Sequence, residues 1–139
     1  MRNYINSNNS HKVTRRIVAA DGYLDLRLPM QAIEELAAIE SGGQMQPAVD
    51  YVMGQALMMQ QNYDEAIEVL QRAAENIPAP FSQLAWTLLA DCLREQGQVE
   101  LAEVVDYFAE EPAELAVQHA QQMGYDELDE FEGYNTLGW

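Results

Sequence analysis

The sequence has a single cysteine, two histidines and only seven basic residues, set against 23 acidic ones, in a chain of 139 residues. One cysteine, Cys92, excludes an intramolecular disulfide and any CxxC metal or redox motif. Because Cys92 lies in the helical pattern LLADCL, we interpret it as a buried structural thiol. No apolar run is long enough to span a bilayer, and the first residues lack the apolar core of a secretory signal. We therefore expect a soluble cytoplasmic protein.

Residue patterns that support catalysis are scarce. His11 and His119 are far apart in the sequence and neither lies in an HExxH-like setting, so we interpret both as surface residues. No GxxxxGK(S/T) or GxGxxG loop is present to bind a phosphate. The paired carboxylates at 34–35 and 110–111 lie at expected helix starts, where the helix dipole explains them. The sequence therefore predicts no catalytic residue, no cofactor and no enzymatic activity.

The net charge of −16 is unevenly distributed along the chain. Residues 1–27 carry a charge of +3, residues 28–99 carry −8, and residues 100–139 carry −11. An acidic body repels phosphate backbones and anionic lipids, so we expect neither nucleic acid nor membrane as a partner. A basic or apolar protein partner fits better, although the charge also suits a role in solubility alone. Five of the seven basic residues lie near the N-terminus: Arg2, Lys12, Arg15, Arg16 and Arg27.

Apolar residues recur at spacings of three and four along most of the chain, and no segment shows the alternation of a strand. The chain is therefore expected to be all-helical, after an Asn- and Ser-rich flexible arm at residues 1–10. Helices are expected at about 12–28, 29–41, 47–61, 62–77, 82–96, 99–109 and 113–123. In the helix at 99–109, the residues expected on the buried face are Leu101, Ala102, Val105 and Phe108.

Two segments, 54–73 and 90–109, carry the same skeleton of small residues 36 positions apart. A period of this length inside helical patterns is typical of repeated helix pairs. Two antiparallel helices about 8–10 Å apart need small residues where their axes come closest. We expect Gly54 to meet Ala66 there, and Ala90 to meet Ala102. Ala73 and Ala109 complete the two copies of the skeleton.

Residues 51–78, YVMGQALMMQQNYDEAIEVLQRAAENIP, closely resemble a tetratricopeptide repeat. The residues that carry this resemblance are Gly54, Leu57, Tyr63, Ala66, Leu70, Ala73 and Pro78. In the next unit they are Trp86, Leu89, Ala90, Leu93, Gly97, Ala102 and Ala109, and the unit departs from the pattern at Asp106. A first unit matches more weakly, through Ala20, Tyr23, Ala32 and Leu36.

The resemblance implies an all-α fold, a right-handed superhelical stack of antiparallel helix pairs with a C-terminal capping helix. Its three units are expected at about 12–40, 47–78 and 82–110, and the capping helix at 113–123. The repeat domain then covers residues 11–124 and is preceded by the arm at 1–10. An acidic and aromatic tail follows at residues 125–139.

In this family the first helix of each pair lines a concave groove that holds an extended or helical peptide. Carried onto this sequence, the groove positions are Tyr51, Gln55, Met58, Thr87, Asp91 and Arg94. They lack the cluster of Lys, Asn and Arg by which some members bind the carboxylate end of heat-shock chaperones. Tyr51 and Met58 suit an apolar or mixed segment instead. Alternatively, these two side chains simply pack on a neighbouring helix.

The resemblance therefore implies a non-catalytic module that binds a peptide or protein partner. A secretion-type chaperone that shields an apolar client segment is one alternative, because acidic three-repeat proteins of this size are similar to such chaperones. A self-associating module, for example a homodimer, is another. An enzyme or metal protein is disfavoured, because too few titratable groups are available to build a site.

The tail at residues 125–139 interleaves acidic and apolar side chains, beginning with YDELDEFEGY. This stretch lacks the alternating oxygen ligands and the internal glycine of an EF-hand loop, so we expect no metal there. Acidic residues mixed with aromatic ones are typical of a short linear motif. The tail could dock on its own repeats, bind a partner, or remain free. We expect Leu137 and Trp139 to anchor it on the repeats.

Overall fold

The computed structural model describes residues 2–110, and the side chains of residues 9–109. Over this range the chain forms six α-helices and one 3-10 turn, with no strand. These elements are α1 (Arg2–Asp25), α2 (Pro29–Ala37), η1 (Gly43–Met45), α3 (Gln46–Met59), α4 (Tyr63–Asn76), α5 (Ser82–Glu95) and α6 (Val99–Glu110). The predicted all-α stack of helix pairs is confirmed.

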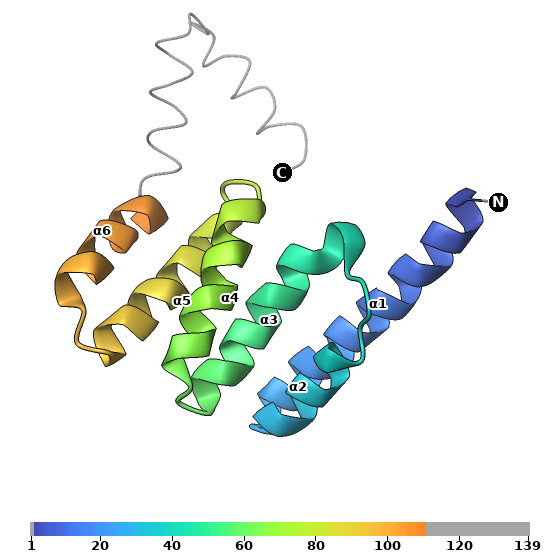
Figure 1. The fold of residues 1–139 in the computed structure, drawn as a ribbon, viewed down its shortest axis with the longest axis horizontal. Helices are drawn as coiled ribbons and strands as arrows, with labels where there is room; N and C mark the ends of the chain where they lie inside the picture. The colour runs from blue at the N-terminus through green and yellow to red at the C-terminus, as the bar shows by residue number, and fades with distance from the viewer. Residues whose placement is uncertain (1, 111–139) are drawn as a thin grey trace, which may run out of the picture.

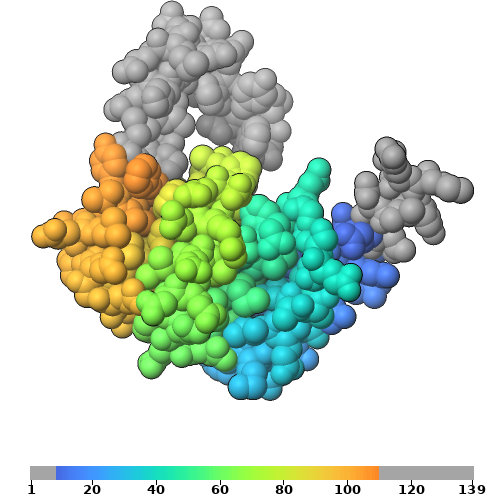
Figure 2. All heavy atoms as spheres, in the orientation of Figure 1, coloured from blue at the N-terminus to red at the C-terminus, as the bar shows by residue number. Residues whose placement is uncertain are grey.

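Consecutive helices form antiparallel pairs, α1 with α2, α3 with α4 and α5 with α6, and the three pairs stack side by side (Figure 1). The middle pair joins the two others, because α3 packs on α2 and α1, and α4 packs on α5. Side chains fill the spaces between the ribbons (Figure 2). The second helices of the pairs all run toward the end of the stack at which α3 and α5 begin, and α2 stops short of it.

The turn inside each pair has the same geometry in all three pairs. One residue of each turn has a left-handed backbone: Arg27 with φ 62°, Gln61 with φ 61° and Gly97 with φ 79°. The amide of the following residue donates to the carbonyl five residues earlier, at 2.8, 2.9 and 2.8 Å. This is the Schellman way of ending a helix. The turns are 34 and 36 residues apart, so the weakly matching first unit is a true repeat.

The small residues of the skeleton lie where the helices pack most closely. Ala20, Ala32, Ala66, Ala90 and Ala102 are completely buried. A Cβ atom on Gly54 would lie 2.4 Å from the side chain of Leu70, so only glycine fits there. The three atoms nearest to such a Cβ all belong to Leu70, one turn after the expected Ala66. Leu70 fills the space that the missing side chain leaves.

Three clusters of buried residues form a continuous core. The first lies between α1, α2 and α3, the second between α3, α4, α5 and α6, and the third between α4 and α5. Tyr51 of α3 packs against all three clusters. Because each pair covers its apolar side with the next pair, the stability of each pair depends on its neighbours.

The first pair departs from the repeat. Shifted by the 34-residue spacing of the first two turns, α3 would begin at residue 12 and α4 would end at residue 42. Instead α1 begins at Arg2 and α2 already ends at Ala37. The helix therefore runs through residues 2–10, where the composition predicts a flexible arm. These residues lie in register with the rest of α1, and the helix ladder continues through them.

Helix α6 is the last described element, and its burial differs from the expectation. Ala102 and Val105 are buried, but Leu101 and Phe108 are 48% and 49% exposed. The physical reason is that, among the described helices, α6 packs mainly on α5. Phe108 stacks on Trp86 of α5 at a ring centroid distance of 5.3 Å. The predicted capping helix at 113–123, the tail at 125–139, and with them His119, Leu137 and Trp139 lie outside the described residues.

Candidate functional groove

The first helices of the three pairs, α1, α3 and α5, lie next to one another along one side of the stack. At one end of this row, a hollow of about 460 Å³ opens between α3, α5 and the linker from α4 to α5. Its apolar lining consists of Met45, Pro47, Ala48, Tyr51, Ile77, Pro78, Phe81 and Leu84, and its polar lining of Gln44 and Asn76. We call this the apolar hollow.

Two side chains of the apolar hollow are conspicuously exposed. Phe81 in the linker is 69% exposed, and Leu84 in the first turn of α5 is 61% exposed. Leu84 belongs to the apolar pattern that predicts α5, but it points away from the core residues Ala85 and Leu89. Exposed apolar residues that gather around a concave hollow are typical of a protein-binding surface. Sequence periodicity missed this role because it does not distinguish a core position from an exposed apolar one.

Tyr51 connects the apolar hollow to α1. Its side chain is half-buried and lines the hollow. Burial raises the pKa of Tyr51, and the negative charge of Asp21 on α1 raises it further. Tyr51 thus lines the hollow and also packs against the buried clusters, and its role in binding a partner stays a prediction.

The other predicted groove residues of α3, Gln55 and Met58, are half-buried. Met58 packs against the central core cluster beside Leu57. Neither residue lines the apolar hollow.

The predicted groove residues of α5 are engaged within the chain. Thr87 donates its hydroxyl to the carbonyl of Gln83 at 2.8 Å. The guanidinium of Arg94 binds the carboxylate of Asp91 at 2.9 Å, and it also pairs with Asp106 of α6. Asp106 stands where the repeat pattern requires an apolar residue, and its pairing with Arg94 accounts for that departure. The charge of Arg94 is thus compensated by two carboxylates of its own pair.

A polar hollow of about 650 Å³ adjoins the apolar one and shares Gln44, Pro47 and Asn76 with it. At its base lies Asp50, a charged residue that is only 6% exposed. Asp50 accepts a hydrogen bond from Gln46 at 3.0 Å and faces the guanidinium of Arg72 at 3.6 Å. A buried carboxylate needs such partners, because an unpaired charge is costly to bury. The sequence signal that was missed is an acidic residue between Val49 and Val52 on an apolar helix.

Cys92 is completely buried, as the helical pattern predicts. Burial raises the pKa of the Cys92 thiol to about 11, and the neighbouring carboxylates of Asp91 and Glu95 add to the effect. The thiolate that a nucleophile requires is therefore disfavoured at neutral pH.

Metal-binding clusters and membrane-spanning helices are both absent from residues 2–110. No group of three or more His, Cys, Asp and Glu side chains in this range is arranged to hold a metal ion. No helix in the same range combines the length and apolarity needed to cross a bilayer.

The comparisons with known proteins agree with this architecture. The family model described as tetratricopeptide repeat matches residues 17–81 and again residues 51–114. The two matches overlap in the middle pair and together span residues 17–114 of the 139. Searches of the curated proteins and of the solved structures found no match. The repeated turns, the buried small residues and the family matches lead to one conclusion: the chain belongs to the tetratricopeptide repeat family.

Proposed function

We propose that this chain is a protein–protein interaction module that binds a peptide segment along α1, α3 and α5. An apolar side chain of the partner inserts into the apolar hollow between Tyr51, Phe81 and Leu84. The single observation that carries the proposal is this hollow of about 460 Å³, with exposed apolar side chains at its edge. Burial of Phe81 and Leu84 by a partner supplies the main driving force.

The charge of the groove selects the rest of the segment. Asp21 lies near Tyr51 and forms no ion pair within residues 9–109. Arg94 is compensated by Asp91 and Asp106, so it leaves no free positive charge for an acidic ligand. A segment with an apolar anchor followed by Lys or Arg therefore fits best. This mode of binding needs no catalytic residue.

A displayed library of random peptides, selected on the full chain, tests the proposal. We expect the selected peptides to share an apolar anchor and at least one nearby basic residue. Leu84→Glu should weaken their binding at least tenfold, because it places a charge in the apolar hollow. Met30→Glu is the matched control, since Met30 is 62% exposed on α2, outside the groove. Equal binding to the wild type and Leu84→Glu would contradict the groove assignment.

Self-association is a second candidate, because α6 exposes Leu101, Val104 and Phe108. Light scattering distinguishes the two: a stable dimer that Val104→Gln dissociates favours self-association. A chaperone for an apolar client is a third candidate. It predicts that the chain keeps an aggregation-prone client soluble and that Leu84→Glu abolishes this effect.

A further inference from the structure

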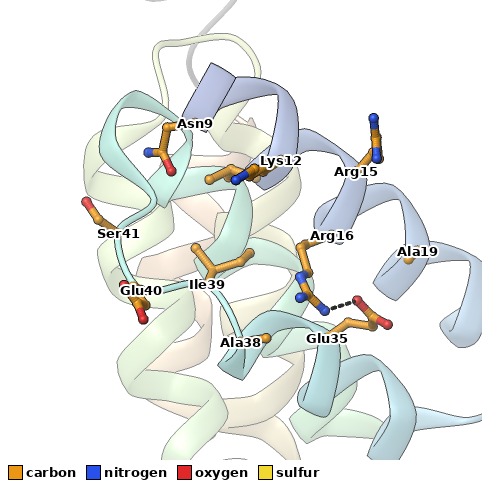
Figure 3. A pocket seen from close by; sticks show the side chains of 11 residues that line it. Asn9, Lys12, Arg15, Arg16, Ala19, Glu35, Ala38, Ile39, Glu40 and Ser41 are labelled. Carbon is orange, nitrogen blue, oxygen red and sulfur yellow. Dashed lines mark hydrogen bonds and ion pairs between the residues drawn. The ribbon is translucent and has the colours of Figure 1, made fainter. Parts of the chain in front are cut away.

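A third cavity, of about 550 Å³, lies at the other side of the stack from α6, between α1 and the segment that follows α2. Lys12, Arg15 and Arg16 line it from α1, and Glu35, Ile39 and Glu40 line it from α2 and the following loop (Figure 3). We call it the basic pocket. None of these residues lines the apolar hollow or the polar hollow.

The basic pocket lies where the first pair departs from the repeat. Helix α2 ends at Ala37, about five residues before the position at which the equivalent α4 ends, while α1 extends ten residues beyond the start of α3. One flank of α1 is therefore covered by the loop at residues 38–42 rather than by a helix. The polar hollow occupies the corresponding place between the start of α3 and the end of α4, so the basic pocket is distinguished by the loop and the cations that line it.

The cations of the basic pocket are only partly compensated. Arg16 Nη1 binds Glu35 Oε2 at 3.0 Å, and both side chains are partly exposed. Lys12 and Arg15 form no ion pair within residues 9–109. Glu40 is the only other acidic residue of the lining, and Figure 3 shows it on the far side of the pocket from Arg15. Two positive charges are thus left for a ligand.

We propose that the acidic segment at residues 126–132 of this chain docks on the basic pocket. The charges are complementary along the sequence: residues 2–20 contain four basic residues and no acidic one, and residues 111–139 contain seven acidic residues and no basic one. Five of those seven lie between residues 126 and 132. Several pairs acting together stabilise such contacts, because single exposed ion pairs contribute little.

The chain can make this contact within one molecule. Glu110 ends α6 at the same edge of the stack as the loop that follows α2. The fifteen residues at 111–125 reach about 50 Å when extended. With helices packed 8–10 Å apart, α6 and α1 are separated by about 30–40 Å. Tethering also gives an effective concentration on the order of millimolar, which favours the same chain over a second copy.

Zero-length carbodiimide coupling of the full chain tests the proposal, because Lys12 is the only lysine in the sequence. The reagent joins an amine to a contacting carboxylate, and mass spectrometry after chymotrypsin digestion identifies the linked pair. We expect Lys12 to be linked to a carboxylate within residues 126–132 of a monomer. Links to Glu35 or Glu40, which line the same pocket, show that the reagent reached Lys12. The Lys12→Arg variant keeps the charge and shows which links require the amine.

Charge reversal supplies the second measurement. Arg15→Glu should lower the yield of the link from Lys12 to residues 126–132 at least fivefold. Arg27→Glu changes the net charge by the same amount in the turn after α1, outside the basic pocket, and should leave the yield unchanged. Sodium chloride at about 0.5 M should reduce the yield in the wild type, since the charges are exposed.

Three outcomes would overturn the proposal. The first is that Lys12 links only to Glu35 or Glu40. The second is that a mixture of isotope-labelled and unlabelled chains shows the link between two copies, which would assign the pocket to a second molecule. The third is an equal effect of Arg15→Glu and Arg27→Glu, with circular dichroism showing that both variants are folded.

Discussion

At the α1 edge of the stack most of the exposed side chains are charged or polar, whereas at the α6 edge they are large and apolar. Lys12, Arg15 and Arg16 surround the basic pocket on α1. On α6, by contrast, Leu101 and Val104 are about half exposed. The α1 edge resembles an ordinary solvated surface. The α6 edge instead resembles the apolar face on which a repeat normally stacks its neighbour. This difference makes the exposed apolar face of α6 the edge at which to test for a covering segment.

The middle pair packs on both outer pairs, so a substitution in its core should have the largest effect on the free energy of unfolding. Leu70 is completely buried and fills the space beside Gly54. Leu70→Ala should lower the free energy of unfolding by about 2–5 kcal/mol, because it leaves a cavity between α3 and α4. Urea denaturation followed by circular dichroism measures this. Two separate transitions in the variant would show that the edges unfold independently, against the continuous core described above.

Alkaline pH should weaken the core between the two edges. The pKa of the Cys92 thiol is raised from 9.0 to about 11 in the folded chain, and that of Tyr51 is also raised. The folded state holds these protons more tightly than the unfolded state, so stability is unaffected below about pH 9 and falls as pH rises toward 11 and beyond. The loss should reach about 2 kcal/mol. Thermal unfolding from pH 8 to 11 measures it.

The Cys92→Ala variant is the control for this pH dependence. Above pH 9 its unfolding temperature should fall less steeply with rising pH, because the raised pKa of Cys92 no longer contributes and that of Tyr51 still does. An unchanged slope would remove Cys92 from the explanation.

A matched pair of exposed valines tests the comparison of the edges directly. Val104 on α6 is 54% exposed and Val18 on α1 is 66% exposed within the described structure. If the segment at 113–123 covers α6, Val104→Gln should cost about 1 kcal/mol in the full chain, because it loses apolar burial. Val18→Gln should change stability by less than about 0.5 kcal/mol. Equal, small effects of both substitutions would indicate that the α6 edge is solvated like the α1 edge.

The smallest expected effect belongs to the ion pair at the α1 edge. Arg16 and Glu35 are 3.0 Å apart, but their side chains are partly exposed. Arg16→Gln should therefore lower the free energy of unfolding by less than about 0.5 kcal/mol at moderate salt. Chemical denaturation at 0.05 and 0.5 M sodium chloride measures this. A loss above about 1 kcal/mol would show that the α1 edge depends on this pair more than its exposure suggests.

Much of the fold follows from the sequence, because the small-residue skeleton reports helix packing directly. The spacing of Gly54, Ala66, Ala90 and Ala102 predicts the stack, and Gly97 predicts the left-handed end of α5. The extension of α1 was not predictable from composition, since Asn- and Ser-rich residues have weak helix propensity and join the helix by continuing its ladder.

The site was less predictable than the fold. Family register indicates Tyr51, and the structure places it in the apolar hollow. The exposed apolar roles of Phe81 and Leu84 depend on how the linker between α4 and α5 turns, which no periodicity encodes. The basic pocket depends on where α2 ends, and helix ends are the least certain part of any sequence pattern.

The three equivalent turns share a backbone conformation but not a residue type. Only the last uses glycine, while Arg27 and Gln61 adopt a left-handed conformation that side chains disfavour. Glycine at those two positions would relieve local strain without altering any helix face. Glycine at these turns would therefore offset the loss of stability that a substitution in the groove causes. The groove residues can then change to bind another partner while substitutions in the turns maintain the stability of the helix stack.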